Sequence, residues 1–379
     1  MKHKLFALLS ALMTTGLVLA ACAAPAAAPA APAAEAEATE AVAAEAPAAA
    51  PAEGEAAAGP FTIGVSNSFV GSEWRTQMIQ NMQDLNAEFM AAGLTNELVI
   101  ENADTDAQGQ IQQIQNLINK GVDAIIINPG DVAALNATLE EAVDAGIVVI
   151  AVDQEIGAAG VYNVVIDQKE WAMISARWLA EQLGGQGDIV LIEGFVGHPA
   201  NEARMAGVAE VLAEYPDIKV VGRDTGKWDQ ATGQQVMSNF LASLPNIDGV
   251  WTQDGMASGV LQALITAGKF PINSGEARVS YLQMWDETLA ANPDFKTIGV
   301  VNPPGVGASG MRVALNILMG KAVDESKLAG PFGTSMYVPI PAPITPETFA
   351  AEYAAVKDMP ASYTLDKILS EEEANAFFK

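Results

Sequence analysis

The sequence predicts an α/β fold of two doubly wound parallel-sheet lobes, joined by a hinge that the chain crosses three times. From Phe61 onward, short runs rich in β-branched residues alternate with segments of helical length. Several of these runs are apolar throughout, as expected for parallel strands that helices cover on both faces. The roughly 320 residues of this region exceed what one hydrophobic core usually serves, so two lobes are expected.

The first lobe begins with a strand pattern at residues 61–66. A helix should follow, because large apolar residues from Trp74 to Phe89 recur every three or four positions. Further strands are predicted at residues 97–101, 123–128 and 146–153, with helices between them.

The second lobe repeats the alternation from about residue 162. Strands are predicted at 162–167, 188–194, 218–222, 248–254, 278–285 and 296–301, followed by a helix at 311–318, a strand pattern at 335–340 and a helix around 349–356. The predicted first lobe comprises residues 60–164 and 300–330, and the second lobe residues 165–299 and 331–379. The hinge crossings are expected near residues 163–166, 286–300 and 328–337.

The N-terminus has the pattern of a bacterial secretory signal over residues 1–21. Two lysines precede an apolar run from Leu5 to Leu19, which is short for a membrane span. The Leu-Ala-Ala-Cys sequence that ends at Cys22 resembles the lipobox of lipoproteins, in which cleavage leaves this cysteine first and lipidated. Cys22 is the only cysteine of the chain, so we expect lipid attachment there. Residues 22–59 are almost only Ala, Pro, Glu and Gly, which predicts a disordered tether.

The composition argues against nucleic-acid binding and against enzymatic chemistry. The net charge of −27 repels polyanions. The chain has two histidines, and His3 falls in the signal. We expect the other, His198, to face solvent or cap a helix. There is no nucleophile elbow, and the common zinc arrangements lack ligands. The sequence therefore predicts no catalytic residue, no cofactor and no metal.

Residues 305–310 contain a literal G-x-G-x-x-G. A dinucleotide-binding fingerprint lies in the first βα turn of a unit, with an acidic residue about twenty positions later at a strand end. Here the glycines come late in the chain, and Asp324 follows in a polar segment. We therefore interpret the glycines as a tight turn that lets the backbone approach a ligand beside Asn302.

Polar residues stand where most of the predicted strands end. In an open parallel sheet, ligands bind outside the carboxyl ends of the strands. Asn and Asp also end strands and cap helices without binding anything, but their concentration here favours a ligand site. These residues include Asn67, Asn102, Asn128, Asp153, Gln154, Glu193, Asp224, Gln253, Asp254, Trp285 and Asn302.

The signal, the tether and the two lobes together resemble a type I periplasmic binding protein of an ABC sugar importer, similar to the ribose, galactose and galactofuranose binders. The resemblance covers about residues 61–356. It is carried by the first-lobe segment 110–153, by "WTQDGMASGVLQAL" at 251–264, and by "SNSFVGSEWRTQM" at 66–78, which is most like the galactofuranose branch. Where the family often has Asp-Arg, this chain has Asp153-Gln154, which leaves the identity of the sugar open.

The resemblance implies ligand contacts from Glu73, Trp74, Arg75, Asp153, Arg204, Trp228, Asp229, Asp254 and Asn302. Such residues suit a sugar, because carboxylates, amides and guanidinium groups bind hydroxyls and aromatic rings cover C–H faces. Trp74 could equally be a core residue, and the arginines could be surface ion-pair partners. The full candidate set is Asn67, Glu73, Trp74, Arg75, Asp153, Gln154, Asn201, Arg204, Trp228, Asp229, Asp254, Trp285 and Asn302.

The sequence thus predicts a monomeric, extracytoplasmic lipoprotein anchored to the bacterial membrane. It would bind a small neutral sugar or polyol, close about its hinge and deliver the ligand unchanged to the transmembrane subunits of an ABC permease. The alternative is a sugar-sensing protein that docks to a membrane chemoreceptor or sensor kinase. A transcriptional repressor is disfavoured, because residues 23–59 contain no helix-turn-helix and no basic face.

Overall fold

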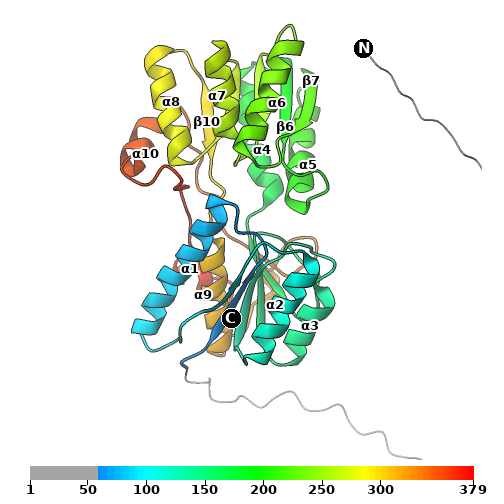
Figure 1. Cartoon of the computed structure of the whole chain (residues 1–379), viewed down its shortest axis with the longest axis vertical. Helices are drawn as coiled ribbons and strands as arrows, with labels where there is room; N and C mark the ends of the chain where they lie inside the picture. Colours follow the sequence, from blue (N-terminus) through cyan, green and yellow to red (C-terminus); the bar gives the residue numbers. More distant parts are fainter. Residues whose placement is uncertain (1–58) are drawn as a thin grey trace, which may run out of the picture. The chain divides into compact units, whose positions relative to one another are not determined.

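The computed structural model describes residues 59–379, in which two parallel sheets are each covered by helices (Figure 1). The two α/β lobes predicted from the sequence are confirmed. Cys22, the expected signal and the expected tether up to residue 58 lie outside the described residues. Within the described part of the chain, no helix is both long enough and apolar enough to cross a membrane.

The first sheet has six parallel strands in the order β11-β5-β4-β3-β1-β2. They are β1 (Ile63–Asn67), β2 (Val99–Asn102), β3 (Ala124–Asn128), β4 (Val148–Val152), β5 (Tyr162–Val165) and β11 (Ser335–Tyr337). Helices α1 (Glu73–Ala91) and α9 (Val306–Leu318) cover one face, and α2 (Ala107–Asn119) and α3 (Asn136–Asp144) cover the other (Figure 1). The continuous apolar run of β3 follows from this, because Ile126 packs on the α1 side while Ile125 and Ile127 pack on the α2 side.

The second sheet has five parallel strands in the order β10-β9-β8-β6-β7. They are β6 (Gln186–Glu193), β7 (Asp217–Thr225), β8 (Gly249–Thr252), β9 (Ile272–Glu276) and β10 (Thr297–Val300). Helix α4 (Gln168–Gln182) packs with α5 (Pro199–Ala213), α6 (Gln230–Ser243) packs with α7 (Ala257–Ala267), and α8 (Val279–Ala291) packs with α10 (Phe349–Val356).

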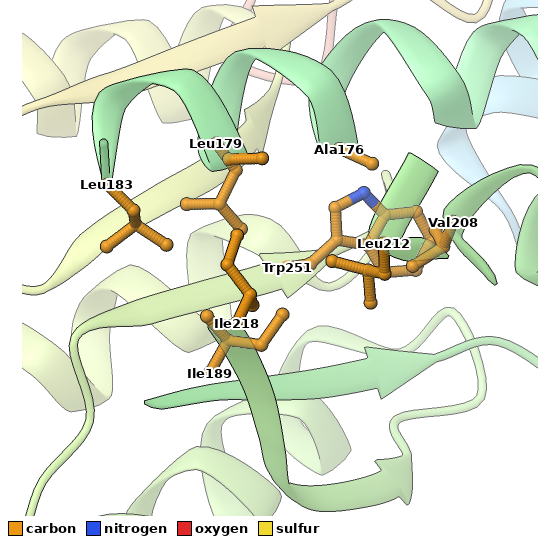
Figure 2. A pocket seen from close by; sticks show the side chains of 9 residues that line it. Ala176, Leu179, Leu183, Ile189, Val208, Leu212, Ile218 and Trp251 are labelled. Atoms are coloured by element: carbon orange, nitrogen blue, oxygen red, sulfur yellow. The ribbon is translucent and has the colours of Figure 1, made fainter. Parts of the chain in front are cut away.

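A small apolar hollow lies under α4 and α5 in the second lobe (Figure 2). Leu179, Ile189, Val208 and Trp251 are among its lining residues, and it leaves no room for a water molecule. The indole N–H of Trp251 is already satisfied by Ser175 Oγ at 2.9 Å. The hollow is therefore ordinary core packing and offers nothing to a polar ligand.

The strand predicted at residues 278–285 is wrong. β9 ends at Glu276, Arg278 is the N-cap of α8, and the helix begins at Val279. Tyr281, Leu282 and Trp285 are all buried on α8. Their spacing of one and three residues is that of a helix face rather than of a strand.

The glycines at residues 305–310 do not approach a ligand as the sequence suggested. Gly307 and Gly310 lie inside α9, where a Cβ would come 2.7 Å from Met78 and 2.6 Å from Val152. The small residues thus let α9 pack tightly on α1 and β4.

The chain passes between the lobes after β5, after β10 and after β11, which pairs with β5 in the first sheet. The strand pairing differs from the expected boundaries, because residues 286–300 stay in the second lobe and residues 335–337 belong to the first. A fourth passage was not predicted. Leu365 donates to Ala277 O in the second lobe at 2.8 Å, and Asp366 then accepts from the Gly305 backbone N–H at the start of α9. Helix α11 (Glu371–Asn375) packs on α9.

Candidate ligand-binding site

The polar residues at the carboxyl ends of the strands form one cluster in each lobe. The first-lobe cluster contains Asn67, Arg75, Asn128, Asp153 and Gln154. The second-lobe cluster contains Arg204, Trp228, Gln253, Asp254 and Asn302. Each cluster follows from the strand register, because parallel strands bring their carboxyl ends to the same edge of the sheet.

Arg75 organises the first-lobe cluster from the first turn of α1. Its Nη1 donates to Asn67 Oδ1 at 2.8 Å, and its Nη2 lies 3.8 Å from Asp153 Oδ2. Asp153 Oδ2 also accepts from Gln154 Nε2 at 3.1 Å. Burial lowers the pKa of Arg75, and the carboxylate of Asp153 opposes this shift. The guanidinium stays charged in any case, because its ordinary pKa lies far above neutrality.

Asn128 adds an unused acceptor to the first-lobe cluster. The residue is buried at the end of β3, and its Nδ2 lies 3.4 Å from Asp153 Oδ2. Its Oδ1 is buried and has no hydrogen-bond partner. Buried polar atoms are nearly always paired in native proteins, so an unpaired acceptor beside a carboxylate indicates a place for a ligand donor.

Arg204 organises the second-lobe cluster from α5. Its Nη1 donates to Asp254 Oδ1 at 2.6 Å and to Gln253 Oε1 at 3.1 Å, and its Nε donates to Gln168 at 2.8 Å. The guanidinium lies over the ring of Trp171, 4.0 Å from the ring centroid. The side chain of Arg204 is only 3% exposed. A buried arginine held on every side in this way is a fixed donor rather than a surface ion-pair partner.

Asn302 and Trp228 complete the second-lobe cluster. Asn302 Nδ2 donates to Asp254 Oδ2 at 2.9 Å, and Trp228 Nε1 donates to Gln253 Oε1 at 2.7 Å. The indole of Trp228 lies so close to the backbone that a Cβ at Gly194 would come 2.2 Å from the ring. Position 194 must therefore be glycine to leave room for the Trp228 ring.

Backbone strain is concentrated at the two clusters. Of the residues that the structure describes, three other than glycine have positive φ: Asp153 at 68°, Lys227 at 55° and Trp228 at 51°. Two of the three belong to the clusters. Such conformations cost energy and are retained mainly at functional sites, so they support the assignment independently of residue type.

Four predicted residues have other roles in the structure. Glu73 pairs with Arg278 of the second lobe. Trp74 is buried in the core of the first lobe, and its Nε1 donates to Asn302 O at 2.8 Å. Asp229 is an exposed N-cap of α6. Trp285 is fully buried and stacks on Phe349 with a centroid distance of 4.3 Å, so it lies in the core and not at a strand end.

Asn201 is buried beneath the second-lobe cluster. Its Oδ1 accepts from the Gly194 backbone N–H at 2.8 Å and from Gln253 Nε2 at 2.9 Å. Asn201 therefore positions Gln253 instead of facing a ligand itself.

Three residues of this region are absent from the candidate set that the sequence predicts. Asn128 and Gln253 are among the strand-end residues but are not in the predicted set of ligand-binding residues. Phe69, in the loop after β1, is 46% exposed, and the guanidinium of Arg75 lies 5.8 Å from its ring centroid. Phe69 could have been found from the sequence, because it is an aromatic residue two positions after Asn67, at the end of the first predicted strand. His198, which was expected to face solvent or cap a helix, is the half-buried N-cap residue of α5; its side chain makes no capping hydrogen bond and lies 4.8 Å from Trp228 between ring centroids.

A polar hollow of about 820 Å³ lies at the opposite edge of the second sheet, where Gln186 and Asp217 begin their strands. Ligands of open α/β sheets bind at the carboxyl edge instead, so we do not assign the site there. Among the described residues, no group of three His, Cys, Asp or Glu side chains could hold a metal ion.

Comparison with known proteins places this geometry in a family. Residues 63–322, more than half of the chain, match the periplasmic binding protein domain family. The chain belongs to the periplasmic binding protein family. Its similarity to curated members includes 38% identity with the xylitol-binding protein of Mycolicibacterium smegmatis, over 46% of this chain and 50% of that protein. The chain is also 27% identical to the ribose import binding protein of Bacillus subtilis, over 70% of this chain and 84% of that protein.

Solved structures show the same two-lobed fold. An ABC transporter solute binding protein from Thermobispora bispora superposes with a TM-score of 0.71 at 27% identity, covering 83% of this chain and 94% of that chain. One from Bacillus halodurans with bound myo-inositol gives a TM-score of 0.66 at 27% identity, covering 79% and 99%. These relatives are solute-binding proteins and not enzymes. This periplasmic binding protein therefore shares its two-lobed fold with solute-binding proteins of ABC transporters.

Proposed function

We propose that this periplasmic binding protein is the extracytoplasmic solute-binding lipoprotein of an ABC importer and that it binds a small neutral sugar or polyol. The observation that carries the proposal is charge balance. Each cluster contains one arginine and one aspartate, Arg75 with Asp153 and Arg204 with Asp254. A site whose charges cancel in pairs has no spare charge for an ionic ligand, but it has many donors and acceptors for hydroxyls.

The remaining groups suit the same ligand class. The amide side chains of Asn67 and Asn128 offer neutral partners for hydroxyls, and the Asn128 Oδ1 has no partner within the described residues. The indole of Trp228 and the ring of Phe69 offer apolar faces for C–H groups. Three relatives support this class of ligand: one is named for xylitol, one is named for ribose, and one was solved with bound myo-inositol.

The family and the N-terminal sequence support the proposal that the protein delivers its ligand to a permease. The bound sugar would be released unchanged to the transmembrane subunits after the lobes close on it and reopen. Cys22 would hold the protein at the membrane through its lipid, and residues 23–58 would give the binding lobes reach.

Asp254 provides the test, because its carboxylate joins Arg204 to Asn302. We expect at least one of xylitol, ribose and myo-inositol to raise the melting temperature of the wild-type protein. Asp254→Asn should weaken binding of that compound at least tenfold by calorimetry, because a buried arginine then loses its counter-charge.

Asp229→Asn is the matched control. It makes the same chemical change at an exposed helix cap, where asparagine caps as well as aspartate, so its affinity should equal that of the wild type. If the wild-type protein bound only charged solutes, the proposed function would be refuted. If Asp254→Asn kept the wild-type affinity, the assigned site would be refuted.

A further inference from the structure

Arg204 is held by the first turn of α4, the helix that follows the first passage between the lobes. Strand β5 ends at Val165 and α4 begins at Gln168. Gln168 Oε1 accepts from Arg204 Nε at 2.8 Å, and the ring of Trp171 covers one face of the guanidinium. Both α4 side chains are buried. A planar guanidinium that is held at one edge and on one face has a fixed orientation.

Trp171 also connects this arginine to the second passage between the lobes. Its Nε1 donates to Val301 O at 3.2 Å, and Val301 is the first residue after β10. The next residue, Asn302, shares the carboxylate of Asp254 with Arg204. These contacts form a closed circuit, which runs through Trp171, Val301, Asn302, Asp254 and Arg204 and back to Trp171.

The contacts of Arg204 leave one of its nitrogens available. Nε donates to Gln168, and Nη1 donates to Gln253 and Asp254. Among the described residues, none accepts a hydrogen bond from Nη2. The direction in which Nη2 points is therefore set by the groups that fix the plane of the guanidinium, and Gln168 and Trp171 are two of them.

We propose that Gln168 and Trp171 are positioning residues of the sugar site, which act on the ligand through Arg204 and keep it in register with the two passages between the lobes. This inference rests on the proposed function, in which Arg204 donates to a ligand hydroxyl. A donor that is already ordered in the free protein avoids an entropic cost on binding. A guanidinium with a looser orientation would keep its charge but bind the hydroxyl more weakly.

Trp171→Phe tests the circuit, because it keeps an aromatic face for Arg204 and removes the N–H that reaches Val301. Trp251→Phe is the matched control. Trp251 is also fully buried, and its Nε1 donates to Ser175 Oγ, outside the circuit. Calorimetry and thermal unfolding would use the full chain with xylitol, ribose and myo-inositol. We expect both variants to melt at lower temperatures, and Trp171→Phe alone to bind about three- to tenfold more weakly.

Two substitutions of Gln168 give a second measurement that does not depend on the tryptophan variants. Methionine has a similar length but its sulfur accepts only weakly, so Gln168→Met leaves Arg204 Nε without its partner. Gln168→Glu keeps an acceptor and removes Nε2, a buried nitrogen that has no hydrogen-bond partner in the described residues. We expect Gln168→Met to bind about tenfold more weakly than the wild type, and Gln168→Glu to recover most of this affinity.

Two results would overturn the positioning role and leave the proposed function intact. One is wild-type affinity in both Trp171→Phe and Gln168→Met. The other is an equal loss of affinity in Trp171→Phe and Trp251→Phe, which would show that any lost indole in this lobe has the same effect. Failure of the wild type to bind any of the three compounds would instead overturn the proposed function, and the inference with it.

Discussion

The surroundings of Arg204 explain how its charged guanidinium can be buried. Gln168, Gln253 and Asp254 accept its hydrogen bonds, and Trp171 covers its face. A buried charge without such partners would cost several kcal/mol, so the neighbours are as necessary as the arginine. Asp254 and Gln253 each have a further bond to Asn302 or Trp228, which makes the second-lobe cluster one connected network. Changing one member should therefore disturb the others.

Asn128→Leu tests the unpaired acceptor at the end of β3. Leucine has a similar shape but no oxygen, so it removes a buried group that has no partner in the free protein. We expect the melting temperature of the free protein to change little, because the lost Oδ1 has no partner and the lost bond from Nδ2 to Asp153 is long, at 3.4 Å. Affinity for the sugar should fall about tenfold, as expected for a lost ligand hydrogen bond of roughly 1.4 kcal/mol. A lower melting temperature with unchanged affinity would show that Asn128 is purely structural.

Residue roles were predictable from the sequence where they depend on strand ends and not where they depend on long-range partners. Arg75, Asp153, Arg204, Asp254 and Asn302 lie in the two clusters because each follows or faces a strand end. The ion pair of Glu73 was not predictable, since its partner Arg278 lies 205 residues away. The contact of His198 with Trp228 was not predictable, because nothing near it in sequence indicates that ring.

At the scale of elements, α1 presents a polar ridge to the fourth interlobe passage. Glu73, Gln77 and Asn81 recur every four residues and so share one helix face. Gln77 Nε2 donates to Thr364 O at 2.8 Å and its Oε1 accepts from the Thr364 N–H at 2.9 Å. Asn81 donates to Asp366 at 2.5 Å. The ridge thus fastens the returning C-terminal segment to the first lobe.

Gln77→Ala should destabilise the protein by about 1–3 kcal/mol, because it leaves both backbone groups of Thr364 without their partner. Gln80→Ala on the same helix is the control. Gln80 is exposed and bonds only to Asp84, four residues on, so its loss should cost no more than about 0.5 kcal/mol. Urea unfolding of both variants measures the difference. Equal stability of the two variants would show that the ridge does not hold the segment.

Elements with strong periodicity were predictable, and those with competing signals were not. The apolar runs of β3 and β4 predict buried parallel strands because helices cover both faces. Residues 278–285 contain Val, Tyr and Trp, which favour a strand, yet tertiary packing against Phe349 makes them a helix. The fourth passage had no local signal, because it consists of single bonds between a short irregular segment and distant residues.

At the scale of the whole molecule, the acidic charge and the N-terminal sequence support our proposal that the protein is anchored at a membrane surface. The net charge of −27 keeps such a chain soluble and away from other polyanions. A binding protein gains little from high affinity if it diffuses away from its permease. A lipid at Cys22 would keep the two lobes near the membrane, with the Ala-, Pro- and Glu-rich residues as spacer.

Cys22→Ala tests this arrangement without touching the binding lobes. In a bacterial host that processes lipoproteins, the wild-type chain should fractionate with membranes, and the variant should lose membrane association, because the thioether-forming sulfur is gone. Affinity for the bound sugar should be equal in both proteins, since Cys22 lies outside the matched residues 63–322. Mass spectrometry of the wild type should show the added lipid mass at the N-terminus. Persistent membrane association of Cys22→Ala, or an unmodified wild-type cysteine, would contradict lipid anchoring while leaving the sugar site standing.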